Sequence, residues 1–133
     1  MRHTLAGALL ALLIGVSVVA AGRQTTGAPK DLDARVTAFL QQHRNDWHDL
    51  NVQEADGQQL YDLVLKNGYT RALEIGTSTG RSGIYIAWAL AKNGGKLITI
   101  DIDEARHRQA VQNFNDAGVG AFVDARLGDA HDI

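Results

Sequence analysis

A carboxylate and two glycines stand close together in the middle of the chain, in the pattern Glu74-x-Gly76-x-x-x-Gly80. Glycine is suited to positions where the backbone adopts positive φ or approaches a ligand, and a turn built on it can direct amide groups at that ligand. Ser82 and the positive end of a following helix would face the same place. Glu74 would repel a pyrophosphate but can accept bonds from cationic or hydroxyl-bearing groups. The pattern therefore argues against a nucleoside triphosphate as the ligand.

A second carboxylate, Asp101, closes the apolar run at residues 96–101. A carboxylate at the end of the strand beside a glycine loop can accept bonds from both ribose hydroxyls, as in nucleoside-binding α/β proteins. A protein that binds NAD would also place an acid there. The chain contains neither the dinucleotide pattern G-x-G-x-x-G nor the P-loop pattern G-x-x-x-x-G-K-[ST].

The stretch that contains these residues, LEIGTSTGRSGIYIAWALAKNGGKLITIDID at positions 73–103, resembles the catechol and caffeoyl-CoA type of class I S-adenosylmethionine-dependent O-methyltransferase. The resemblance extends from about residue 51 to the last residue. It implies S-adenosylmethionine as the cofactor and a small hydroxylated aromatic molecule as the acceptor. A non-catalytic nucleoside-binding module is the alternative, while Glu74 and the four-residue glycine spacing disfavour an NAD-dependent oxidoreductase.

The resemblance also assigns roles to residues of this chain. Val52 would give backbone contacts to the methionine end of the cofactor, and Glu74 with Ser82 would hold the methionine or the loop geometry. The triplet Gly128-Asp129-Ala130 matches the family's loop after the third strand, which meets the adenine amino group. The residues expected to bind the cofactor are Val52, Glu74, Gly76, Thr77, Ser78, Gly80, Ser82, Asp101, Ile102, Asp129 and Ala130.

Catalytic residues are not expected within this chain. The related enzymes place acidic ligands for a divalent metal such as magnesium, and a nearby base, after a fourth strand, and we expect that part beyond Ile133. The sequence has no HxxxH or HExxH pattern and no clustered carboxylate set, so it predicts no metal ligands of its own. We therefore expect a fragment of a methyltransferase that is inactive alone.

Alternating apolar runs and helical patterns must position these residues. They predict an α/β, Rossmann-like, three-layer α/β/α fold whose parallel sheet is the first βαβαβ half, with two N-terminal helices capping the sheet. A first helix begins with an N-cap at residues 31–33. The other expected elements are helices at 55–66, 82–92 and 103–115 and strands at 73–75, 96–101 and 122–127. Leu63, Ala105, Val111 and Phe114 are among the side chains expected to point inward.

The N-terminus has a different composition. A basic start is followed by an almost wholly apolar run and by Val19-Ala20-Ala21, which is typical of a cleaved secretory signal. We expect a signal peptide at 1–21, a linker at 22–30, a truncated S-adenosylmethionine-binding domain at 31–133, and a secreted or periplasmic protein. An uncleaved membrane anchor is the alternative, because residues 4–22 carry no charge.

Composition excludes some partners. The 133-residue chain has a formal net charge of −2, and its basic residues are dispersed without interleaved aromatic residues, so we expect no nucleic acid partner. After signal cleavage we expect no membrane contact. With no cysteine, a disulfide framework is excluded. The sequence does not predict an oligomeric state.

Overall fold

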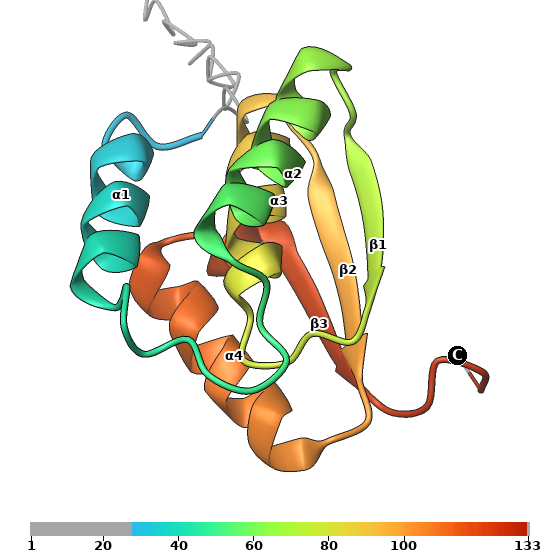
Figure 1. The fold of residues 1–133 in the computed structure, drawn as a ribbon. Coiled ribbons are helices and arrows are strands. Elements are labelled where there is room, and N and C mark those ends of the chain that lie inside the picture. The colour runs from blue at the N-terminus through green and yellow to red at the C-terminus, as the bar shows by residue number, and fades with distance from the viewer. Residues whose placement is uncertain (1–27, 133) are drawn as a thin grey trace, which may run out of the picture.

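The computed structural model describes residues 28–132 as a three-stranded parallel sheet with helices between the strands (Figure 1). The elements in chain order are α1 (Leu32–Gln42), α2 (Glu54–Lys66), β1 (Arg71–Ile75), α3 (Arg81–Lys92), β2 (Lys96–Asp101), α4 (Glu104–Ala117), a 3₁₀ turn η1 (Gly120–Phe122) and β3 (Val123–Leu127). The strand order is β1-β2-β3, with both neighbouring pairs parallel. The predicted α/β fold and parallel βαβαβ order are confirmed.

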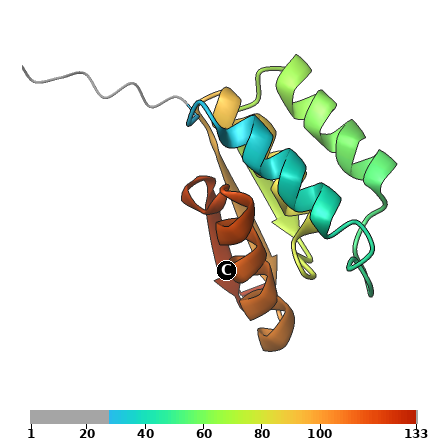
Figure 2. The same ribbon diagram turned by 90° about the vertical axis from the view of Figure 1, so that its left-hand side faces the viewer.

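All four helices lie on one side of the sheet (Figure 1, and from a second direction Figure 2). The helices α3 and α4 pack on the strands, whereas α1 and α2 pack mainly on α3 and α4. The two N-terminal helices therefore cover the sheet through the helices beneath them. The second helical layer of the expected three-layer arrangement is not among the described residues.

The core surrounds α3, which packs on the sheet on one side and on α1, α2 and α4 on the others. The helix α3 is rich in small and aliphatic residues, and nearly every one of its side chains is buried. Ile84, Leu90 and Leu97 are fully inaccessible, as is Phe114 apart from 1% of its surface. Burial of side chains this large is the main favourable contribution to folding. It also fixes the start of α3 against β1, where the glycine loop connects them.

Alternation along the strands divides the sheet into two faces. Glu74, Thr99 and Asp101 point to the helices, while Leu73 and Ile75 point to the opposite face and are 63% and 68% exposed. No described helix covers that opposite face (Figure 1). Both carboxylates singled out from the sequence thus lie on the covered side.

Three side chains expected to point inward do not. Leu63 is 53% and Val111 36% exposed, and Ala105 is also exposed. On α4 the buried positions are Ala110, Phe114 and Ala117, because that stripe faces α3 and β3. On α2 the packed stripe likewise runs through Gly57 and Val64 rather than Leu63.

The helix ends are mostly where the sequence placed them. Asp103 caps α4 by accepting a bond from the backbone N–H of Arg106 at 2.9 Å, and Gly118 ends that helix with φ of 88°. Asp31 stands at the N-cap of α1, but its side chain makes no capping hydrogen bond, so this part of the expectation was wrong. The backbone of Asp31 instead accepts from Arg35 N–H.

The predicted signal peptide at 1–21 and most of the linker at 22–30 lie outside the described residues. From residue 28 to residue 132, no helix combines the length and the apolar character that a membrane span requires.

Candidate cofactor-binding site

A cavity of about 340 Å³ opens at the carboxyl ends of the three strands. In open parallel sheets this edge is where ligands bind, and the volume lies at the lower end of the roughly 300–1,000 Å³ found for small-molecule sites. Six of the residues predicted from the sequence line it: Gly76, Ser78, Asp101, Ile102, Asp129 and Ala130. The others, Val52, Glu74, Thr77, Gly80 and Ser82, lie outside the lining.

The glycine loop forms one wall of this cavity. The backbone N–H groups of Gly76 and Thr77 both donate to the carbonyl of Ile100, at 2.8 and 3.3 Å, which holds the loop over the end of β2. Gly76 has φ of 90°, and a Cβ added there would meet nothing within 4 Å. The loop therefore leaves open space where a ligand can approach the backbone.

Ser78 follows in this loop and has two unusual features. Its φ is 49°, a left-handed conformation that is uncommon for a residue other than glycine. Ser78 is among the residues that line the cavity, but its Oγ is buried and has no hydrogen-bond partner among the described residues. A buried hydroxyl without a partner costs stability, which adds to the cost of the left-handed backbone at this residue.

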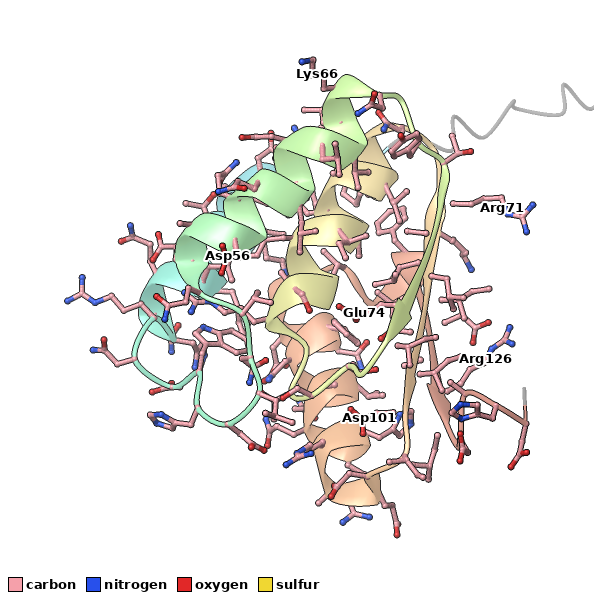
Figure 3. The ribbon with its side chains drawn as sticks, turned by 45° about the vertical axis from the view of Figure 1, so that its right-hand side comes forward. Asp56, Lys66, Arg71, Glu74, Asp101 and Arg126 are labelled. Carbon is pink, nitrogen blue, oxygen red and sulfur yellow. The ribbon has the colours of Figure 1, made fainter. Side chains whose placement is uncertain are left out.

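Asp101 connects the loop to the end of β2 and is only 7% exposed. Its Oδ2 accepts from the backbone N–H of Ser78 at 2.7 Å, and its Oδ1 accepts from that of Asp103 at 2.9 Å. An ionised carboxylate has about four acceptor positions, so two remain for ligand hydroxyls. Figure 3 shows Asp101 on the helix-facing side of the sheet, below Glu74.

Glu74 lies behind the loop rather than in the cavity. Its Oε1 accepts from the hydroxyl of Ser82, and its Oε2 accepts from that of Thr99 at 2.6 Å. Thr99 also bonds Thr77, with 2.5 Å between their hydroxyl oxygens. Burial raises the pKa of Glu74, and the two hydroxyl donors oppose that shift only in part. In this structure the contacts of Glu74 and Ser82 tie β1, β2 and the first turn of α3 together.

Gly80 and Val52 support the loop from outside the cavity. Gly80 caps α3 with φ of 99°, and a Cβ added there would lie 2.9 Å from the ring of Phe114. Only a glycine therefore fits without displacing the core. Val52 is half-buried in the segment before α2, and its carbonyl accepts from Arg81 Nη1 at 3.3 Å.

Several lining residues were not predicted as site residues: Leu50, Ile75, Ile100, Arg106, Gly128 and His131. Leu50 lies in the connection between α1 and α2, and Arg106 lies on α4, so neither belongs to a strand end. The hydrogen bond between Arg106 and Asp49 brings them to the cavity, and nothing in the neighbouring sequence predicts that bond. His131 lies next to a predicted residue. Its backbone N–H and Nδ1 both contact Asp129 Oδ1, at 2.9 and 2.8 Å, and these bonds lower the pKa of Asp129.

No group of three or more His, Asp or Glu side chains within residues 28–132 is arranged to hold a metal ion. The described chemistry of the site therefore consists of backbone amides, the carboxylates of Asp101 and Asp129, the guanidinium of Arg106 and the imidazole of His131.

A parallel βαβαβ unit with a glycine turn after β1 and a carboxylate at the end of β2 defines a Rossmann-like nucleoside-binding class. The family model described as O-methyltransferase matches residues 31–133, and the chain belongs to that family.

Two curated relatives show the extent of the match. A catechol O-methyltransferase of Niastella koreensis is 44% identical over 61 residues, which cover 46% of this chain and 27% of the relative. Caffeoyl-CoA O-methyltransferase 2 of Zea mays is 31% identical over 87 residues, which cover 65% of this chain and 33% of the relative. The matched part thus spans a third or less of these relatives.

Solved structures give the same picture. The O-methyltransferase TomG of Streptomyces achromogenes, in complex with SAM, has a TM-score of 0.62 and 35% identity, over 74% of this chain and 44% of that one. An O-methyltransferase of Bacillus cereus, in complex with SAH, has a TM-score of 0.63 and 31% identity. The match covers 78% of this chain and 46% of that one. The chain spans less than half of either structure.

Proposed function

We propose that this chain is the S-adenosylmethionine-binding half of an O-methyltransferase that acts on a small hydroxylated aromatic acceptor. The observation that carries the proposal is Asp101, a nearly buried carboxylate with free acceptor positions beside an open glycine loop. The SAM and SAH bound in the two solved relatives support the choice of cofactor. The names of the catechol and caffeoyl-CoA relatives support the class of acceptor.

The residues of the cavity fit this cofactor. Asp101 would accept from the ribose hydroxyls, and Asp129 with Ala130 would meet the adenine amino group. The backbone N–H of Ser78, another lining residue, donates to Asp101 Oδ2 and holds that carboxylate in place. Val52, Glu74 and Ser82 would set the methionine end through the loop and the segment before α2. The cofactor, when bound, supplies an electrophilic methyl group, and the protein's task is to fix its orientation.

Titration calorimetry on the full chain tests cofactor choice. We expect S-adenosylmethionine and S-adenosylhomocysteine to bind and NAD to give no heat of binding, because the loop lacks the G-x-G-x-x-G spacing that receives a pyrophosphate. Binding of NAD in preference to S-adenosylmethionine would contradict the proposal. Absence of any nucleoside binding would favour a module that keeps only the fold.

A methyl-transfer assay tests catalysis. The assay follows S-adenosylhomocysteine formation with catechols and hydroxycinnamoyl thioesters, with and without magnesium, which we propose as the metal of the complete enzyme. We expect no turnover from the 133 residues alone. Turnover above a no-protein control would contradict this and would require a base among Asp56, His131 and Asp132.

We also propose that the apolar N-terminus directs export and is removed after Ala21. Mass spectrometry of the protein from its native host should then give a mature start at Gly22. An intact Met1 on a membrane-bound protein would favour the anchor instead.

A further inference from the structure

The segment at 47–54, which runs from the connection after α1 to the first residue of α2, lies against the glycine loop without pairing to any strand. Side chains attach it at both ends. At one end, Asp49 Oδ2 accepts from Arg106 Nε at 2.7 Å, and the same oxygen forms an ion pair with Nη2 at 2.6 Å. Because Leu50 and Arg106 both line the cavity, this segment forms part of the cavity wall.

Asn51 joins the middle of the segment to the loop. Its Nδ2 donates to Thr79 Oγ1 at 2.7 Å, and its Oδ1 accepts from the backbone N–H of Arg81 at 3.3 Å. The same Nδ2 donates to the carbonyl of His48 at 2.8 Å, which closes a local turn. The position of Val52, the next residue, therefore depends on how this part of the segment is held.

Arg81 completes the attachment from the first position of α3, and its side chain is only 9% exposed. Nη1 donates to the carbonyl of Val52 at 3.3 Å, Nη2 is 3.7 Å from a carboxylate oxygen of Glu54, and the guanidinium lies 5.6 Å from the ring centroid of Trp47. All three partners belong to the segment at 47–54. Its Nε is buried without a partner among the described residues.

This arrangement is poor as a stabilising ion pair. A buried charge is costly unless it is closely paired, and replacement of such a group by an apolar side chain of similar volume is often neutral or stabilising. Glu54 is 75% exposed on its side chain and too far for a close pair. What Arg81 does achieve is to fix the Val52 carbonyl and the Trp47 ring relative to α3.

We propose that Arg81 is a positioning residue for the cofactor site, which holds the segment at 47–54 over the glycine loop and acts through Val52 without touching the cofactor. The inference rests on the proposed function, since it concerns the same cavity.

The test compares the full chain with the variants Arg81→Met and Arg81→Lys. Arg81→Met keeps the apolar stem, so we expect the urea midpoint to stay unchanged or rise. We expect its dissociation constant for S-adenosylmethionine to rise about tenfold, corresponding to about 1.4 kcal/mol. Arg81→Lys keeps the positive charge but loses the planar guanidinium, so its affinity for S-adenosylmethionine should lie between those of Arg81→Met and the wild type. The matched control is Arg108→Met, because Arg108 lies on the exposed surface of α4 in a pair with Glu104.

A second readout does not need the cofactor. In a Trp88→Phe background, Trp47 is the only tryptophan, and its acrylamide quenching reports whether the segment stays in place. We expect quenching to rise in Arg81→Met and to stay unchanged in Arg108→Met. Unchanged quenching together with unchanged affinity would overturn the proposal, as would an affinity loss that only follows a loss of stability. If the wild-type chain does not bind S-adenosylmethionine, the proposed function fails, and the cofactor role of Arg81 fails with it. The quenching of Trp47 still decides, in that case, whether Arg81 holds the segment at 47–54.

Discussion

Replacement of Asp101 by alanine should affect both the fold and the site. The carboxylate accepts two backbone N–H bonds, from Ser78 and Asp103, and the N–H of Ser78 is buried with its residue only 5% exposed. A bond to a charged acceptor contributes roughly 1.5–3 kcal/mol. We count one such bond as lost in the free protein, because water can replace the partner of the more accessible Asp103.

The expected loss of about 1.5–3 kcal/mol is a large part of the roughly 5–15 kcal/mol that stabilises an ordinary domain. Loss of the acceptor for the ribose hydroxyls should weaken the binding of S-adenosylmethionine by a similar free energy. This corresponds to a dissociation constant that is higher by about one to two decades. Urea denaturation without ligand measures the first effect, and titration calorimetry at a temperature well below the midpoint measures the second.

The matched control is Asp124→Ala. Asp124 is also a strand carboxylate, but it is exposed and pairs with Arg126 on the face of the sheet away from the helices. Removal of an exposed pair should change stability little and affinity not at all. An Asp101→Ala variant as stable as the control would refute the loop role of the carboxylate. An unchanged dissociation constant would remove Asp101 from the cofactor site.

Two further predictions concern the supports of the loop. Gly80→Ala should lower the urea midpoint more than Gly94→Ala. Both glycines have positive φ, but only a Cβ at position 80 would meet Phe114, which adds a destabilisation of roughly 1–3 kcal/mol from overpacking. Equal losses in the two variants would show that the Phe114 ring moves aside. Glu74→Gln should gain stability relative to the wild type as pH rises above 4.5, the ordinary pKa of this carboxyl. The folded state raises this pKa and so binds more protons than the unfolded state, and wild-type stability falls with rising pH until the folded pKa is passed. Denaturation from about pH 4 to pH 7 measures this, and parallel curves for the two proteins would contradict it.

The sequence predicted those parts of the fold that depend on neighbouring residues. The bounds of β2 follow from a largely aliphatic run between Lys96 and Asp101, and the cap of α4 follows from Asp103. Gly118 ended the same helix as expected, since its left-handed conformation is easy only for glycine. These signals lie within a few residues of the feature they determine.

Features that depend on distant packing could not be predicted in this way. The exposure of Val111 follows from the rotation of α4 about its axis, which its contacts with α3 and β3 determine. The burial of Arg81 depends on Trp47 and Glu54, which precede it by about 30 residues and reach it only through the turn between α1 and α2. From the sequence, Arg81 was one of several dispersed basic residues.

The strand order has a consequence for synthesis. Among the described residues, β2 and β3 each pair with the strand that precedes them in the chain, and each crossover contains one α-helix, so neither of these two strands has to wait for the third strand of this sheet to follow it. Segments emerge from a ribosome in the same order, at roughly 5–20 residues per second. The pair β1-β2 with α3 can therefore assemble before α4 and β3 have been translated. Such sequential pairing keeps the loop that each crossover must close short, which limits its loop-closure entropy.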